Sequence, residues 1–179
     1  MKSLYGFTLL EVIITLSILV IGIVGISYLI TQTIAGGRIP YQKLIAAYLA
    51  QEGIEIVRNI RDTNWIEEEN WDSDLLCGTP PCDWEADYTT QSFINNCGSA
   101  TNYNCHSYNP NNFLKIDNDG FYNYSSGTDT KFKRKITISE PATPDCPAGD
   151  CLSISVVVEW EEKGKVYKIE CRENLYNWR

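Results

Sequence analysis

The sequence predicts an α+β protein: a long N-terminal helix, half membrane-spanning and half amphipathic, followed by a C-terminal antiparallel sheet of four or five strands. Three observations predict this fold class. A charge-free apolar run covers residues 12–30. Apolar residues then recur at helical spacing as far as residue 61, and alternation with a period of two begins after residue 112. The 179 residues, 44% of them apolar, suffice for one ordinary domain and an accessory element.

The apolar run has the length of a membrane span. Val12 to Ile30 comprises 19 uncharged residues, which as a helix is about 28 Å long and matches a hydrocarbon core of roughly 30 Å. A secretory signal would carry a small-residue cleavage site after its apolar stretch, and we find none. We therefore expect the run to be retained as a single-pass membrane helix.

One acid interrupts this apolar part of the chain. Glu11 is the only charged residue between Phe7 and Ile30. An unpaired carboxylate in a membrane costs at least a few kcal/mol and indicates a functional role. The alternative is a solvated Glu11 at the membrane interface, where the positive end of the helix dipole also favours an acid.

The residues around this acid resemble the prepilin motif of type IV pilins and pseudopilins, in which a short basic leader ends in Gly and Phe-Thr-Leu-x-Glu follows. Here the motif residues are Gly6, Phe7, Thr8, Leu9 and Glu11. The resemblance implies that prepilin peptidase removes a leader of residues 1–6 by cutting between Gly6 and Phe7. It also implies that the new amino group of Phe7 is methylated.

The resemblance further implies how the subunit would assemble. In a filament, Glu11 would pair with the terminal amine of Phe7 in a neighbouring subunit, which removes the cost of two buried charges and sets the register. The polymerisation helix would cover residues 7–35. Implied partners are the membrane, other pilin-like subunits, prepilin peptidase, an assembly platform protein and, indirectly, its ATPase.

A location and a subunit type also follow from the resemblance. The chain would be a single-pass protein of the cytoplasmic membrane with its head outside the cytoplasm, and would then enter a cell-surface or periplasmic filament. Its moderate length, the acid at position 11 and the C-terminal Asn-Leu-Tyr-Asn-Trp-Arg resemble minor pilins and I-type minor pseudopilins. A minor subunit is therefore expected, with a major pilin as the alternative.

The amphipathic half of the helix is expected over residues 36–62. Glycines at 36 and 37 and a proline at 40 predict a bend, a loosened turn or a complete break. Four apolar residues beyond them share one face, and Gly53 allows close approach of a neighbour; the resemblance implies that this half packs on the sheet. The four are Ile45, Leu49, Ile56 and Ile60, and the residues expected to face mostly outward are Gln51, Glu52, Glu55, Arg58 and Arg61.

Residues 63–112 form a cysteine-rich region that we expect to be irregular and exposed. Seven cysteines after the apolar run favour an oxidising, exported location. Six of them form close pairs that local disulfides would close, although six cysteines allow fifteen pairings. The pairs are Cys77–Cys82, Cys97–Cys105 and Cys146–Cys151. The tryptophans of this region, Trp65, Trp71 and Trp84, are expected to be lids over the local core, with subunit contacts as the alternative.

Residues 113–179 are expected to form the antiparallel sheet. One hairpin would turn at residues 118–120, and a second at Lys163-Gly164. Alternation places Phe132, Arg134, Ile136 and Ile138 on one face, and residues 152, 154, 156, 158 and 160 on one face of a later strand. Cys171, the odd cysteine, is expected to be a buried thiol. Most of the basic stretch formed by Lys131, Lys133, Arg134 and Lys135 is expected on the solvated face of a strand.

Other functional classes find little support. The net charge of −8 and the missing basic face argue against binding to nucleic acid. A calcium site is conceivable at Asp117-Asn118-Asp119-Gly120, but a tight hairpin turn is the favoured interpretation. A zinc site is conceivable at Cys77, Cys82, Cys146 and Cys151, but disulfides are favoured. His106 is the only histidine, so we expect no enzyme, no catalytic residue, no metal site and no cofactor. A membrane-anchored extracellular binding module, an adhesin or DNA-uptake receptor with the helix as a tether, is the rival function.

Overall fold

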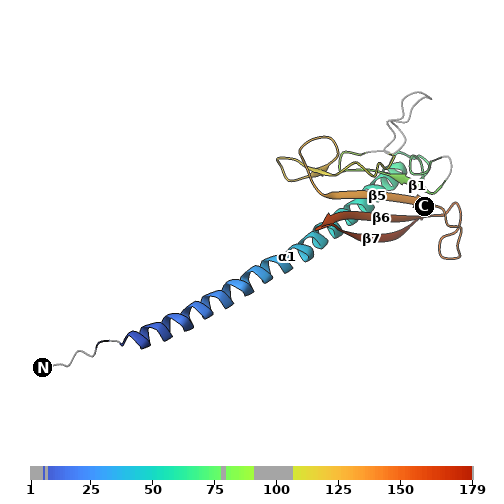
Figure 1. Ribbon diagram of the computed structural model, residues 1–179. Coiled ribbons are helices and arrows are strands. Elements are labelled where there is room, and N and C mark those ends of the chain that lie inside the picture. The colour runs from blue at the N-terminus through green and yellow to red at the C-terminus, as the bar shows by residue number, and fades with distance from the viewer. Residues whose placement is uncertain (1–5, 7, 78–79, 91–106, 179) are drawn as a thin grey trace. The chain divides into compact units, whose positions relative to one another are not determined.

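The computed structural model describes residue 6 and residues 8–77, 80–90 and 107–178, apart from the side chains of residues 35 and 36. The chain forms two compact units, Met1–Gln42 and Lys43–Arg179, the second of which is called the head. The elements in chain order are α1 (Leu9–Ile66), β1 (Cys82–Trp84), β2 (Lys115–Ile116), β3 (Tyr122–Asn123), β4 (Thr128–Asp129), β5 (Phe132–Ser139), β6 (Cys151–Glu162) and β7 (Lys165–Tyr176) (Figure 1). The predicted α+β layout is confirmed.

Residues 36–40 are helical, so the complete break considered at this point is wrong. Pro40 lacks only one backbone donor, which a long helix can lose without ending. The helix also continues beyond the range of residues 36–62 expected for its second half, because Ile66 is its last residue.

A backbone motif ends α1. The amide of Glu69 donates to the carbonyl of Asn64 at 2.9 Å, and Glu68 between them has a φ of 61°. This is the Schellman arrangement, in which a left-handed residue lets the chain turn back and satisfy the last carbonyls. Glycine normally takes this position, so the sequence offered no clear signal for the helix end.

The main sheet of the head has the antiparallel order β1-β5-β6-β7. The β6–β7 hairpin turns where expected, and its central residues Lys163 and Gly164 have φ values of 53° and 74°, as a type I′ turn requires. The alternation along β5 and β6 is also confirmed, because every second residue is buried. Strand β1 was not expected, since residues 63–112 gave only a loop signal.

A second, smaller sheet has the order β3-β2-β4. Its β2–β3 hairpin is the one predicted at residues 118–120, but it does not join the main sheet. The reason is that β2 pairs with β3 on one edge and with β4 on the other. The main sheet accordingly has four strands.

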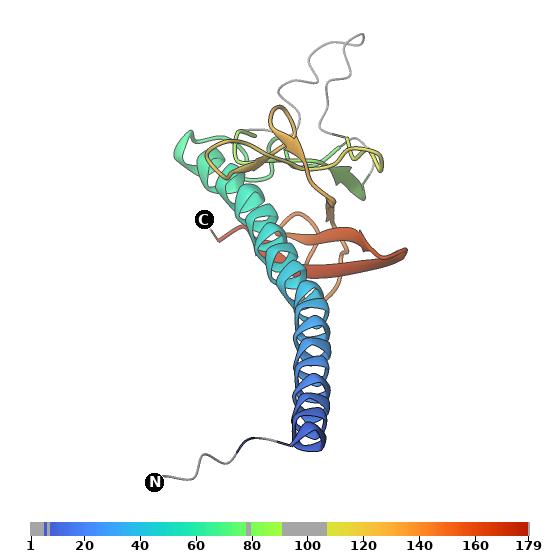
Figure 2. The same ribbon diagram turned by 60° about the vertical axis from the view of Figure 1, so that its left-hand side comes forward.

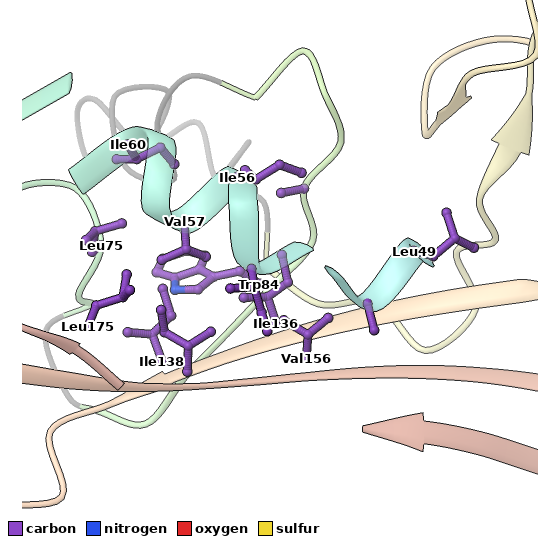
Figure 3. Packing of buried hydrophobic residues seen from close by; sticks show 14 of the residues in the cluster. Leu49, Ile56, Val57, Ile60, Leu75, Trp84, Ile136, Ile138, Val156 and Leu175 are labelled. Carbon is purple, nitrogen blue, oxygen red and sulfur yellow. The ribbon is translucent and has the colours of Figure 1, made fainter. Parts of the chain in front are cut away.

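The core of the head lies where the second half of α1 covers one face of the main sheet (Figure 2). Buried helix residues such as Val57 and Ile60 face Ile136, Ile138 and Val156 of the sheet (Figure 3). The predicted role of Gly53 is confirmed, because a Cβ there would meet Val156 Cγ1 at 2.8 Å. Three tryptophans belong to the same core, as the lid interpretation predicted: Trp65, Trp71 and Trp84.

Two arginines are buried. Arg134 belongs to a basic stretch of which most was expected to be solvated, but its side chain is 0% exposed, on the face where the alternation placed it. Arg61 was expected to face outward and is buried, with its guanidinium 4.5 Å from the Trp65 ring centroid. Long aliphatic stems let arginine line an apolar core while its head group finds acceptors, which polarity-based reasoning does not foresee.

Candidate functional site

The first unit presents an apolar surface with nothing covering it. From Leu9 to Ile34, the exposure of its large apolar side chains ranges from 43% at Val12 to 82% at Leu9. By length and composition α1 could cross a membrane. Such a surface is unstable in water and needs lipid or partner helices around it.

Four hydroxyl groups in this segment donate to backbone carbonyls of the helix itself. Thr15 Oγ1 donates to the Glu11 carbonyl at 2.9 Å, and Ser17 Oγ donates to the Ile13 carbonyl at 2.7 Å. Just after the apolar run, Thr31 Oγ1 donates to the Tyr28 carbonyl at 2.8 Å, and Thr33 Oγ1 donates to the Leu29 carbonyl at 2.9 Å. These polar groups are therefore satisfied without water, as a nonpolar environment demands.

Thr8 caps the start of α1. Its Oγ1 accepts the amide of Glu11 at 3.3 Å, and its carbonyl accepts the amide of Val12 at 3.2 Å. Thr8-x-x-Glu11 has the spacing of a capping box, a signal that our sequence analysis missed. The prepilin motif thus also encodes where the helix begins.

Glu11 is exposed, and its carboxylate makes no hydrogen bond or ion pair within the described part of the chain. Phe7, its expected partner in a neighbouring subunit, lies outside the described residues, so the pairing stays a prediction. Gly6 has open space around it, with no atom within 4 Å of a built Cβ.

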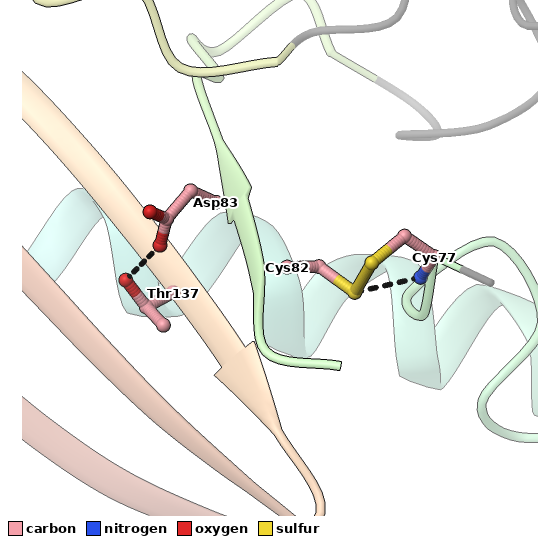
Figure 4. Close-up of a disulfide and its surroundings, with 4 residues drawn as sticks. All are labelled: Cys77, Cys82, Asp83 and Thr137. Atoms are coloured by element: carbon pink, nitrogen blue, oxygen red, sulfur yellow. Dashed lines mark hydrogen bonds between the residues drawn. A yellow bond between two sulfur atoms is a disulfide. The ribbon is translucent and has the colours of Figure 1, made fainter. Parts of the chain in front are cut away.

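Two of the three expected cysteine pairs are disulfides in the structure. Cys77–Cys82 lies at the start of β1, where Asp83 also accepts a hydrogen bond from Thr137 Oγ1 at 2.6 Å (Figure 4). Cys146–Cys151 lies at the start of β6. These bonds overturn the alternative of a four-thiolate zinc site. Cys97–Cys105 lies outside the described residues, as does His106.

Cys171 is a free thiol that is only half-buried, packed against the edge of the core. The expectation of a buried thiol is therefore correct only in part. Cys171 stands on β7, the edge strand of the sheet, where a side chain facing the core is covered from one side only.

The Asp117–Gly120 segment is a hairpin turn. Asp117 Oδ1 accepts the amides of Asp119 at 3.0 Å and Phe121 at 2.9 Å, and Gly120 has a φ of 90°. This carboxylate oxygen is used by the turn itself. Within residues 8–77, 80–90 and 107–178, no group of three or more metal-ligating side chains gathers.

A buried polar network joins the elements of the head. Arg134 Nη1 donates to the Leu49 carbonyl and to Glu52 Oε2, both at 2.9 Å, and Nη2 donates to the Ala86 carbonyl. Asp87 Oδ2 accepts the Tyr124 amide at 3.0 Å. These residues hold the helix, the sheet and the loop together. In the sequence, the only signal for this network was that Arg134 occupies an apolar position in the alternation of β5.

A groove of about 410 Å³ lies between the helix and residues 88–90. Its charged groups are engaged in ion pairs: Arg58 with Glu55 and Glu173, Glu52 with Arg134, and Asp62 with Arg61 at 2.8 Å. Paired surface charges of this kind are typical of structural ion pairs rather than of acid–base catalysis.

A membrane-length N-terminal helix that leads into an α+β head with an antiparallel sheet fits a single-pass membrane anchor. Residues 1–27 match the prokaryotic N-terminal methylation motif, which is the signature of type IV pilins and pseudopilins. The motif supports a pilin-like subunit that is membrane-associated, processed by prepilin peptidase and polymerised with other pilin-like subunits, and it points to a structural subunit rather than an enzyme. Neither a curated protein nor a solved structure matches the chain.

Proposed function

We propose that this chain is a minor subunit of a type IV pilus or of a type II secretion-like pseudopilus. It is cleaved after Gly6, N-methylated at Phe7 and polymerised through α1. The observation that carries the proposal is the methylation motif at residues 1–27, which leads directly into an exposed apolar helix containing one acid. A helix that served only as a tether would have no use for Glu11 in its span.

Glu11 acts in this proposal as the register charge. In a bundle of such helices, its carboxylate meets the positively charged terminal amine of Phe7 in the adjacent subunit. A charge pair of this kind in a low-dielectric bundle is favourable only when the two groups are in contact. One axial stagger of the helices satisfies that condition, so the pair selects it.

Energy for assembly comes from outside the chain, since the sequence contains no nucleotide-binding motif. A cytoplasmic ATPase, acting through a membrane platform protein, would extract subunits from the cytoplasmic membrane. The head, which has two disulfides among its described residues, lies on the oxidising side of that membrane.

Mass analysis of the N-terminus tests the proposal. Protein sheared from the cell surface, or co-purified with filaments, is compared with protein left in membranes. We expect a mature terminus at methylated Phe7 in the filament fraction, present in small amounts relative to the major subunit. An unprocessed Met1 terminus confined to membranes, with prepilin peptidase active, would contradict the proposal and favour the anchored binding module.

Replacing the register charge is the second test. Glu11→Ala is expected to leave membrane insertion and cleavage at Gly6 intact while removing the subunit from filaments, because the Phe7 amine loses its partner. Glu11→Gln keeps the shape without the charge and should fail in the same way. Ser17→Ala, which removes a polar group that the helix already satisfies, is the matched control. Normal incorporation of the Glu11 variants would remove the pairing role.

A further inference from the structure

The two ends of the head can be distinguished by the contacts between α1 and the sheet. Arg134 in β5 donates to the Leu49 carbonyl at 2.9 Å, whereas Arg58, later in the helix, pairs with Glu173 in β7. The β6–β7 turn consequently lies at the end where the head begins, called the Lys43 end. The last helix residue and the C-terminal strand end lie together at the opposite end, called the Ile66 end (Figure 1).

The Ile66 end carries an exposed apolar patch. Ile66 is 79% exposed and Trp178 is 66% exposed. Trp178 is held in place by the buried Trp65, with ring centroids 4.3 Å apart. A large aromatic ring that is fixed on one side and open on the other is the kind of side chain that dominates protein–protein contacts.

Acids surround this patch. Glu67, Glu68 and Glu69 follow Ile66 directly and are exposed, and their carboxylates have no partner within the described part of the chain. Two more acidic residues lie beside the C-terminal strand, because their carbonyls accept hydrogen bonds there: Asp145 from Tyr176 Oη at 2.6 Å and Asp150 from the Asn177 amide at 2.8 Å.

The Lys43 end has the opposite character. Lys43, Lys163 and Lys165 are exposed there and form no ion pair within the described residues. Of the acids beside the turn, Glu162 is already neutralised by Lys131 at 2.6 Å, which leaves Glu161. The same end exposes apolar side chains: Leu44 (53%), Tyr48 (64%) and Val166 (64%).

These opposite charges cannot neutralise each other within one head. Lys43 and Ile66 are separated by 23 residues of helix, which is about 35 Å at 1.5 Å per residue. That distance is several times the Debye length of about 8 Å at physiological salt. The charge on each end is therefore available to another molecule.

We propose that the Ile66 end of one copy docks on the Lys43 end of a second copy of this chain. Trp178 and Ile66 pack against the exposed apolar residues of the Lys43 end, while Glu67 and Glu69 face Lys163 and Lys165. Because two different surfaces at opposite ends of the head meet, the contact is heterologous and repeats as an open chain. This inference rests on the proposed function, and it adds that copies of this minor subunit lie next to one another in the filament.

A charge swap tests the contact. Glu67→Lys/Glu69→Lys and Lys163→Glu/Lys165→Glu each place like charges across it, so each should lower the amount of the full-length protein in the sheared fraction by about tenfold. The variant with all four substitutions restores opposite charges and should return the amount to near wild type. Lysines at the carboxyl end of a helix are favoured by its dipole, so the first variant should fold.

Asp119→Lys/Asp129→Lys is the matched control for Glu67→Lys/Glu69→Lys, because it makes the same change in net charge at exposed positions in and beside the small sheet. It should leave the sheared fraction unchanged. The inference would be overturned if the two variants that change only one end of the head assembled normally. It would also be overturned if the variant with all four substitutions were no more abundant in the sheared fraction than the two-residue variants, since the partner would then be a different subunit.

Cysteine cross-linking of the full-length protein in detergent separates this inference from the proposed function. Glu67→Cys and Lys165→Cys variants, mixed and treated with a mild oxidant, should form a disulfide-linked dimer several-fold faster than either variant alone. Wild type reports the background from Cys171. Dimers without any sheared protein would mean that the contact is real and the filament proposal wrong. Equal rates in all samples would overturn the contact.

Discussion

Gly53 of α1 lies directly against Val156 of β6: a Cβ added at residue 53 would be 2.8 Å from Val156 Cγ1 and 3.3 Å from Arg134 Cδ. The helix can approach the sheet this closely because residue 53 has no side chain. Through this approach the buried polar groups of the sheet and the carbonyl of Leu49 come within hydrogen-bonding distance.

Gly53→Ala should therefore destabilise the head. Alanine gains about 1 kcal/mol in helix propensity, but the added methyl overpacks a dense contact at a cost of about 1–3 kcal/mol. We expect a net loss and a lower Tm, measured by thermal unfolding of the full chain in detergent. Gly37→Ala, in a helical position with no atom within 4 Å of the Cβ, is the control and should not lower the Tm.

Arg134→Met should be more damaging. It leaves the carbonyls of Leu49 and Ala86 and the carboxylate of Glu52 without their donor, and breaking a buried charge pair from one side costs about 3–5 kcal/mol. Urea unfolding monitored by tryptophan fluorescence checks this value. Lys133→Met, the neighbouring residue on the other face, loses only a contact with the Phe113 ring and should cost about 1 kcal/mol or less.

Asp87 should make the stability of the head sensitive to acid. Burial raises the pKa of this carboxyl, but hydrogen bonds from Thr89 and from the Tyr124 amide lower it by more, so its pKa lies below the ordinary value. A depressed pKa contributes stability that is fully present above the unfolded pKa of about 3.9 and is lost as the pH falls through the folded value.

We accordingly expect the free energy of unfolding to fall below about pH 4, as measured by urea titration between neutral and acidic pH. Asp87→Asn should be less stable than wild type at neutral pH and should lose part of this acid dependence. A variant whose pH profile runs parallel to that of wild type would show that other carboxyls are responsible.

Loss of the Cys77–Cys82 disulfide should free β1 from the sheet edge. This bond closes a short loop just before a three-residue strand, and loop-closure entropy suggests about 2 kcal/mol. Limited proteolysis of Cys77→Ser/Cys82→Ser should reveal faster cleavage near residues 80–90. The Cys171→Ser variant, which breaks no bond, should be cleaved at the wild-type rate.

Glu68→Gly should stabilise the end of α1. Glu68 has a φ of 61°, a conformation that costs a non-glycine residue about 1 kcal/mol, and it adds an acid at the negative end of the helix dipole. A higher Tm is the expected result. Glu67→Gly, the adjacent acid outside the left-handed position, should give no such gain.

Much of this molecule was predictable because the relevant signals are local. The membrane-length run, the motif around Gly6 and Glu11, the alternation along β5 and β6, and the Lys163-Gly164 turn each depend on neighbours a few residues apart. The close cysteine pairs at 77–82 and 146–151 were predictable for the same reason.

Long-range contacts decided the rest. Strand β1 exists because Cys82, Asp83 and Trp84 pair with β5, more than fifty residues away, and a three-residue strand has no periodicity to detect. The β2–β3 hairpin was predicted, but the choice of sheet depended on β4 occupying its other edge.

The sequence by itself determined the membrane helix and the pilin signature, because solvent preference and a peptidase motif are read along the chain. Only the tertiary structure decided that Arg134 is buried, since a charge enters a core when distant carbonyls and a carboxylate supply its partners. The tertiary structure also gathered acids at the Ile66 end and lysines without ion pairs at the Lys43 end. The reason is that α1 packs on the β6–β7 hairpin, which brings together residues about a hundred positions apart in the sequence.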